Sequence, residues 1–155
     1  MAKTVLAGIL AVTVIGCTKS AEPASVMSVD AIALDGYDPV AYFVSAQAHR
    51  ADGSYSYSYE NLNWYFQSSE NLERFKADPR AYIPEFGGFC ALELADEDLV
   101  TADPQQWHIH NGRLYLFNDE DAKKEWFSQM VMVLPAAYKA WDAIRNPVEE
   151  TEEED

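Results

Sequence analysis

The sequence predicts a small α+β fold, in which hairpins build a small antiparallel sheet and helices flank it. Hairpin signals occur around residues 55–66 and 107–117, and helix signals around residues 69–78 and 119–146. Strands and helices are thus segregated into hairpins and flanking helices and do not alternate as in βαβ units. With 155 residues, 48% of them hydrophobic, the chain suffices for one domain with a core and for appendages at its ends.

The first residues have the form of an export signal. The apolar run over residues 4–15 follows a lysine and is shorter than the about 20 residues of a membrane span. It ends in Val-Ile-Gly-Cys, which is similar to a bacterial lipobox and implies a signal peptide over residues 1–16 and lipidation of Cys17. The resulting expectation is an outer-membrane lipoprotein that faces the periplasm, with a tether over residues 17–30. An ordinary cleaved signal without a lipid is the alternative.

The domain is expected to span residues 31–147 and to begin with strands. Residues 36–43, Gly-Tyr-Asp-Pro-Val-Ala-Tyr-Phe, combine a turn signal with alternating apolar residues and are expected to form the first strand. Tyrosines then alternate with serines over residues 55–59, which predicts a half-buried strand with its aromatic rings on one face. A polar turn leads into Trp-Tyr-Phe at residues 64–66, so a first hairpin is expected here.

The first helix signal follows this hairpin. The serines at residues 68–69 are suited to cap a helix, since a serine oxygen accepts a hydrogen bond from a free amide of the first turn. Leu72 and Phe75 are expected to form the inner face of this helix. It should end before Pro79, because a residue that precedes proline avoids helical backbone angles.

The second hairpin signal centres on Asn111-Gly112, a pair that tolerates the positive φ angles of a type I′ turn. A two-residue loop pairs the flanking residues outward from the turn, and alternate residues then share a face. The core face is expected to hold Trp107, Ile109, Leu114 and Leu116, and the other, solvated face His108, His110, Arg113 and Tyr115.

A long helix should follow this hairpin. Residues 118–121, Asn-Asp-Glu-Asp, form a strong helix start, and the helix is expected to kink or break at Pro135 and to end near residue 146. Residues 148–155 are rich in glutamate and are expected to be an acidic, disordered tail. The buried residues of the helix are expected to be Trp126, Phe127, Met130 and Leu134, followed by Tyr138, Trp141 and Ile144.

The charge and the motifs limit the possible functions. A formal net charge of −15 disfavours nucleic acid as a partner and favours cationic metals and basic or metal-handling proteins. The sequence contains no phosphate loop, dinucleotide fingerprint, nucleophile elbow or HExxH zinc motif. Binding is therefore a better expectation than catalysis.

Four motifs, "DGYDPVAYF", "WYFQSSENLERFKADPRAY", "PEFGGFCA" and "W.I.NGRLYLF", resemble the YHS domain family and, more narrowly, the exported YHS proteins of bacteria. The resemblance covers about residues 34–130 and implies a YHS-like fold. It also implies metal binding through cysteines, as in the YHS domains of copper-transporting ATPases. The positions that match those cysteines are Ala41, Gln67 and Asn71, so these thiols are absent here.

Cys90 is the main candidate for a functional residue. If Cys17 is acylated, Cys90 is the only free thiol of the mature chain, in an oxidising compartment. The preceding Gly87, Gly88 and Phe89 would allow backbone amides to approach its sulfur. The resemblance implies selenocysteine at this position in some relatives. Three interpretations follow: a ligand of a soft metal such as copper or zinc, a redox thiol, or an inert buried side chain.

Other residues are candidates for a supporting role. His108 and His110, at i and i+2 of a strand, suit a shared metal ion, although a fixed positive charge at Arg113 lies opposite. Tyr37, Asp38 and Tyr42, with Trp64, Ser68 and Asn71, either line a pocket beside Cys90 together with Gly87, Gly88 and Phe89 or are architectural. The function expected first is an accessory protein that binds a metal or cofactor through Cys90. A thiol redox protein and a non-catalytic assembly module are the alternatives.

Overall fold

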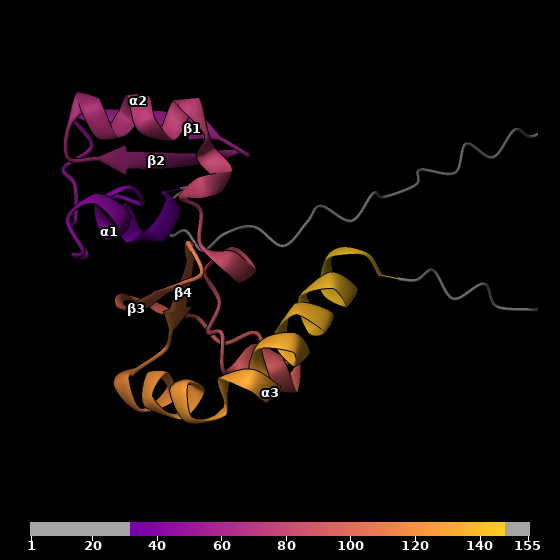
Figure 1. Cartoon of the computed structure of the whole chain (residues 1–155). Coiled ribbons are helices and arrows are strands. Elements are labelled where there is room, and N and C mark those ends of the chain that lie inside the picture. The colour runs from indigo at the N-terminus through magenta and orange to yellow at the C-terminus, as the bar shows by residue number, and fades with distance from the viewer. Residues whose placement is uncertain (1–31, 148–155) are drawn as a thin grey trace, which may run out of the picture.

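The structure is a computed structural model, which describes residues 32–147 and confirms the α+β prediction. Two antiparallel hairpins, each a separate two-stranded sheet, alternate with helices and short 3₁₀ turns. In Figure 1, α2 lies over the first hairpin, and the second hairpin lies between this half and α3. In chain order the elements are η1 (Ala33–Gly36), α1 (Ala41–Val44), β1 (Tyr55–Tyr59), β2 (Leu62–Phe66), α2 (Ser69–Ala77), η2 (Pro79–Ala81), η3 (Glu85–Gly88), η4 (Glu93–Asp96), β3 (Asp103–His110), β4 (Arg113–Phe117) and α3 (Glu120–Arg145).

Several expectations fall outside the described residues. The signal peptide, Cys17, the tether and the acidic tail lie in residues 1–31 and 148–155. Between residues 32 and 147, no helix has both the length and the apolar character that a membrane span requires.

The first half is built on the hairpin β1–β2. Its turn is Glu60-Asn61, with both φ angles positive, and the strands pair from Tyr59 with Leu62 outward. Ser68 caps α2 as expected, since its hydroxyl accepts from the amide of Asn71 at 3.2 Å. These elements bury what we call the N-terminal core, whose largest members are Leu34, Tyr42, Trp64, Phe66 and Phe75, together with Leu114 and Leu116 of β4.

The predicted strand over residues 36–43 is wrong, because the short helix α1 begins within it. The cause is the side chain of Asp38, whose Oδ1 accepts from the amides of Val40 at 2.8 Å and Ala41 at 3.3 Å. A carboxylate that satisfies free amides in this way favours a helix start over an extended strand. The hydrogen bonds of Asp38 thus form a turn that leads into α1, and the alternation of apolar residues does not produce a strand.

The second hairpin has the predicted register, with His110 opposite Arg113, and its turn residues Asn111 and Gly112 have φ angles of 50° and 74°. Its two faces contact two different cores. The face that was expected to be solvated is exposed at Arg113 and half-buried at His108 and His110, but Tyr115 on the same face is buried. Tyr115 is 1% exposed because α3 covers it. We call the second set of buried residues the C-terminal core, and its main members are Phe86, Cys90, Leu94, Tyr115, Phe117, Trp126 and Ala137.

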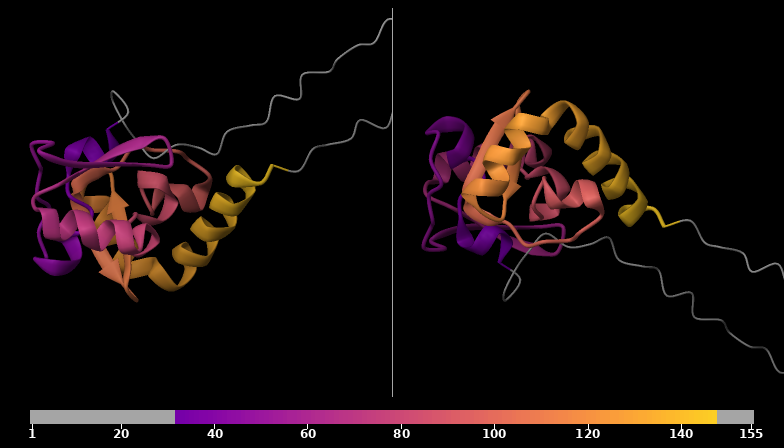
Figure 2. Two further views of the ribbon diagram at one scale, coloured as in Figure 1. Left: turned by 90° about the horizontal axis from the view of Figure 1, so that it is seen from above. Right: turned by 90° about the horizontal axis from the view of Figure 1, so that it is seen from below.

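The helix α3 continues through Pro135 and is bent there. Proline has no amide hydrogen, and its ring displaces the carbonyl four residues earlier, at Val131. The C-terminal half of α3 then runs along the η3–η4 segment (Figure 2). Trp126 is buried as expected, but the expectation for Phe127 is wrong, since this ring is 48% exposed on a different side of the helix.

Candidate functional site

Cys90 lies inside the C-terminal core with none of its surface exposed, which agrees with the interpretation as a buried side chain and not with an accessible metal ligand or redox thiol. Its Sγ donates a hydrogen bond to Asn118 Oδ1 at 3.3 Å. The backbone around it is equally engaged: the Cys90 amide donates to Val100 O at 2.8 Å, and the next amide donates to Leu116 O at 2.9 Å. Cys90 therefore joins the η3–η4 segment to β4 as a packed, hydrogen-bonded core residue.

The segment before Cys90 forms a tight turn. Phe86, Gly87 and Gly88 all have positive φ angles, of 61°, 61° and 89°. The glycines adopt these angles without the steric cost that a Cβ atom brings, so their role here is to reverse the chain. Phe89 then pairs with Thr101 and places its ring 6.2 Å from that of Trp141.

The two hairpin histidines lie against aromatic rings of α3. The ring centroid of His108 is 4.6 Å from that of Phe127 in an edge-to-face arrangement. Burial, aided by the nearby positive charges of His110 and Lys123, lowers the pKa of His108. Within residues 32–147, no three His, Cys, Asp or Glu side chains gather closely enough to hold a metal ion, so Cys90, His108 and His110 do not form such a group.

Asp38 is fully buried and holds the N-terminal half together. Besides the two amides of α1, its carboxyl group accepts from the Gln67 amide at 2.9 Å and from Asn71 Nδ2 at 2.7 Å, both on Oδ2. Three of the four donors belong to Ala41, Gln67 and Asn71. The carboxyl group of Asp38 thus binds the backbone of Ala41 and Gln67 and the side chain of Asn71.

Tyr42 and Tyr37 also have structural contacts. The hydroxyl of Tyr42 donates to Pro104 O at 2.9 Å, and its ring meets Trp107 edge to face at 5.2 Å. Burial raises the pKa of Tyr42. Tyr37 pairs with Arg50 in an isolated bridge. These contacts tie α1 to β3 and support the architectural interpretation of both tyrosines.

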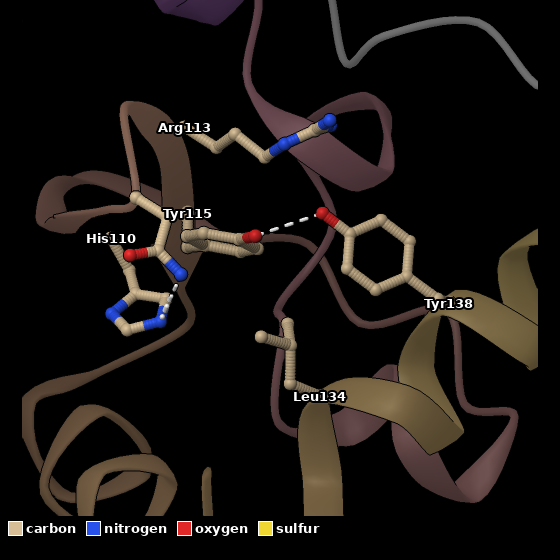
Figure 3. Close-up of a pocket in the computed structure, with 6 residues that line it drawn as sticks. His110, Arg113, Tyr115, Leu134 and Tyr138 are labelled. Carbon is tan, nitrogen blue, oxygen red and sulfur yellow. Dashed lines mark hydrogen bonds between the residues drawn. The ribbon is translucent and has the colours of Figure 1, made fainter. Parts of the chain in front are cut away.

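A groove lies between the tip of hairpin β3–β4 and the bend of α3 (Figure 3). Its polar end has a volume of about 280 Å³ and its apolar end one of about 330 Å³. His110, Leu134 and Tyr138 line both ends, which makes them one continuous feature. The polar end is completed by Asn111, Arg113 and Tyr115, and the apolar end by Met130, Val131 and Pro135.

The polar end is held by a chain of hydrogen bonds that we call the tyrosine network, made of Glu85, Arg113, Tyr115 and Tyr138. Arg113 Nη1 donates to Glu85 Oε1 at 2.6 Å, and the Tyr138 hydroxyl donates to Glu85 Oε2 at 3.0 Å. The hydroxyls of Tyr115 and Tyr138 point toward each other at 2.8 Å (Figure 3). Burial raises the pKa of both phenols, and Glu85 raises that of Arg113, so the phenols stay protonated and the guanidinium stays charged.

The groove differs from the site that the sequence suggested. Of the expected site residues only His110 lines it, whereas Cys90, Tyr37, Asp38, Tyr42, Gly87, Gly88 and Phe89 do not. Two parts of the groove did have a signal in the sequence. The turn at Asn111-Gly112 brings His110 beside Arg113, and Pro135 in the long helix indicates a bend that leaves space beside the helix. The partnership of Arg113 with Glu85 and Tyr138 had no sequence signal, because these residues lie far apart in the chain.

The groove thus places a hydrogen-bonded cluster of hydroxyl and guanidinium groups beside an apolar wall. Comparisons of this chain with protein-family models, with curated proteins and with solved structures find no match.

Proposed function

We propose that this protein is a lipid-anchored, YHS-like accessory protein of the bacterial cell envelope that binds a small ligand in the groove. The groove is the observation that carries the proposal. It combines positioned polar groups at Arg113 and Tyr138 with an apolar wall at Leu134 and Pro135. Ligand sites typically have this composition, with a few polar groups that fix the orientation of a largely apolar ligand.

The YHS-like part of the proposal is supported by the surroundings of Asp38. The backbone amides of Ala41 and Gln67 and the side-chain amide of Asn71 donate to its carboxyl group, so the backbone of the first two positions and the side chain of the third lie close to Asp38. In this chain the aspartate uses these hydrogen bonds to hold α1, β2 and α2 together.

The proposed location in the cell envelope and the proposed binding partners are supported by features of the sequence. The lipobox-like end of the apolar run favours a membrane anchor at Cys17, and the net charge of −15 favours a basic or metal-handling protein as the partner that receives the ligand. A metal or redox role for Cys90 has less support than the groove. Its sulfur is enclosed, so a metal or an oxidant would reach it only after the C-terminal core opens.

The proposal is tested with N-phenyl-1-naphthylamine, an uncharged dye whose fluorescence rises in apolar surroundings. We expect saturable binding to the full chain and about tenfold weaker binding to Val131→Glu, because a carboxylate enters the apolar wall. Val131 is 85% exposed, so this variant should keep the fold. Binding is measured by fluorescence titration, and the fold by thermal melting.

Leu99→Glu is the matched control. Leu99 is an exposed apolar residue outside the groove, so the same change of charge there should leave dye binding unaltered. Equal dye binding by the wild type and both variants would place the binding elsewhere, and no saturable binding by the wild type would reject a ligand function for the groove.

A further inference from the structure

An apolar patch is exposed on α3 next to its bend. Of the six large apolar side chains that are exposed in residues 32–147, three lie here: Phe127 at 48%, Val131 at 85% and Met132 at 78%. Pro135, one turn after Val131, is also exposed. We call these four residues the α3 patch. Exposed apolar residues that gather in this way mark a surface that contacts a protein or a membrane.

The two segments around this patch contain no carboxylate. Residues 104–118, which include the tip of hairpin β3–β4, and residues 126–141, which include the bend of α3, hold no Asp or Glu, although the chain has 26 of them. In both views of Figure 2 the hairpin tip and the bend lie at the same edge of the molecule. Glu85 approaches this edge but is paired with Arg113 at 2.6 Å. The two segments can therefore meet an apolar surface without removing a carboxylate of their own from water.

The polar side chains beside the α3 patch already have partners within the helix. The hydroxyl of Ser128 donates to Glu125 O at 2.8 Å, and Nε2 of Gln129 donates to Glu125 Oε1 at 2.9 Å. A protein interface typically contains about one hydrogen bond per 100–200 Å², and this face offers few free groups for them. The acyl chains of lipids require none. A second copy of the chain would in addition bring another net charge of −15, so a lipid surface fits the α3 patch better than a protein does.

The position of the proposed anchor allows this edge to reach a membrane. The 14 residues between Cys17 and Ile32 span at most about 50 Å, and a domain of this size measures about 35 Å across. A domain anchored at Cys17 can thus turn any face to the bilayer while it stays beside it. Contact with the bilayer is then an intramolecular event, so even a weak contact is populated. Lys139, which is exposed one turn after Pro135, can extend its ammonium group to the lipid head groups.

We propose that the α3 patch docks on the lipid bilayer that holds the anchor, with Phe127, Val131 and Met132 inserted at the boundary between head groups and acyl chains. In this position α3 lies along the membrane surface, as amphipathic helices do. The inference rests on the proposed lipid anchor and goes beyond the proposed ligand site, since Phe127 and Met132 do not line the groove.

The docking is tested with the chain from residue 17, coupled through Cys17 to a maleimide lipid in phosphatidylcholine nanodiscs. Cys90 is enclosed and should not couple. Lipids with a spin label high on one acyl chain broaden the NMR signals of nearby amides. We expect residues 127–135 to lose most of their signal intensity and α2, at the far end of the molecule in Figure 1, to keep its intensity. In Met132→Glu the docked population should fall about tenfold, because a carboxylate would have to leave water.

Leu99→Glu is again the matched control, because it makes the same change at an exposed apolar residue outside the α3 patch and should leave the broadening unaltered. Thermal melting of both variants checks the fold. Equal broadening of α2 and residues 127–135 in the wild type, or unchanged broadening in Met132→Glu, would overturn the docking. A dimer that sedimentation detects without lipid, and that Met132→Glu abolishes, would assign the patch to a second copy and overturn it too.

Two measurements separate this inference from the proposed function. Met132 lies outside the groove, so Met132→Glu should bind the dye as the wild type does. Dye binding without broadening would reject the docking and leave the ligand site in place, whereas broadening without dye binding would do the reverse. Mass spectrometry of the chain isolated from bacterial membranes tests the acylation of Cys17 by itself, since the maleimide lipid replaces the natural anchor in the nanodiscs.

Discussion

Cys90 is held in the C-terminal core by its own side chain and by the backbone on either side. Its Sγ lies 3.3 Å from Asn118 Oδ1, and this contact joins the segment after η3 to the residue that precedes the cap of α3. A sulfur in this setting acts as a small apolar group with one weak hydrogen bond. The thiol of Cys90 can therefore react with an external reagent only when the C-terminal core opens.

This burial predicts slow labelling of the thiol. In a Cys17→Ser chain, Cys90 is the only cysteine, and we expect a disulfide reagent to modify it in the folded protein on the order of a hundred times more slowly than in denaturant, because reaction follows the open fraction. The rate is read from the absorbance of the released thiolate. Labelling of the folded protein at the denatured rate would show that the sulfur is accessible and would restore the redox interpretation.

Asp38 offers a second prediction for a single residue. In Asp38→Asn one acceptor oxygen becomes a donor group that faces existing donors, so we expect the free energy of unfolding to fall by about 3 kcal/mol. The value is measured by urea denaturation. Asp52→Asn is the control, because Asp52 accepts from Ser54 in an exposed turn and should change stability much less. Equal effects of the two variants would contradict the role of Asp38.

His108 makes stability depend on pH. Its pKa is lowered in the folded state, so below the ordinary value of about 6.5 the unfolded chain takes up a proton more readily than the folded chain. Stability from this group is present above that pH and decreases as the pH falls through it. We expect His108→Gln to reduce the loss of stability between about pH 7.5 and 5.5 in urea denaturation. An unchanged loss in His108→Gln would contradict this assignment.

At the scale of the elements, the second hairpin was predicted from two residues and forms with the predicted pairing. Asn111 and Gly112 fix a two-residue turn, and the pairing from His110–Arg113 to Trp107–Leu116 follows from that turn. Beyond Trp107 the register shifts, and Phe117 pairs with Asp103. The cap at Ser68 and the helix start at residues 118–121 were equally local signals and are confirmed, the latter with Asp119 as the cap. What could not be predicted is which element covers which face. Tyr115 lies on the face that the sequence assigned to solvent, and only the packing of α3 reveals that this face is a second core.

The turns themselves supply a prediction. Gly112→Ala should cost about 1 kcal/mol from backbone strain alone, because φ is 74° and no atom lies within 4 Å of the added Cβ. Gly53→Ala should cost more, since φ is 85° and the new Cβ would lie 3.1 Å from the ring of Tyr65. Both values come from urea denaturation. A larger cost for Gly112→Ala than for Gly53→Ala would contradict the role of the contact with Tyr65.

At the scale of the whole molecule, β4 is the element that both cores share. Leu114 and Leu116 point into the N-terminal core, while Tyr115 and Phe117 point into the C-terminal core. Successive residues of one strand therefore belong to different halves of the protein. Because the groove lies at the tip of this hairpin, its walls depend on the integrity of both halves.

This arrangement predicts that the two halves unfold together. We expect Leu116→Ala and Phe117→Ala each to lower the free energy of unfolding by about 3 kcal/mol, since each leaves a cavity in a different core. The loss should appear equally in both halves, because β4 cannot detach from one core while it stays ordered in the other. Hydrogen exchange followed by mass spectrometry measures the protection of peptides from β2 and from α3 in each variant. If Leu116→Ala weakened protection only in β2 and Phe117→Ala only in α3, the halves would be independent units. The groove would then stay intact when only the N-terminal half unfolds.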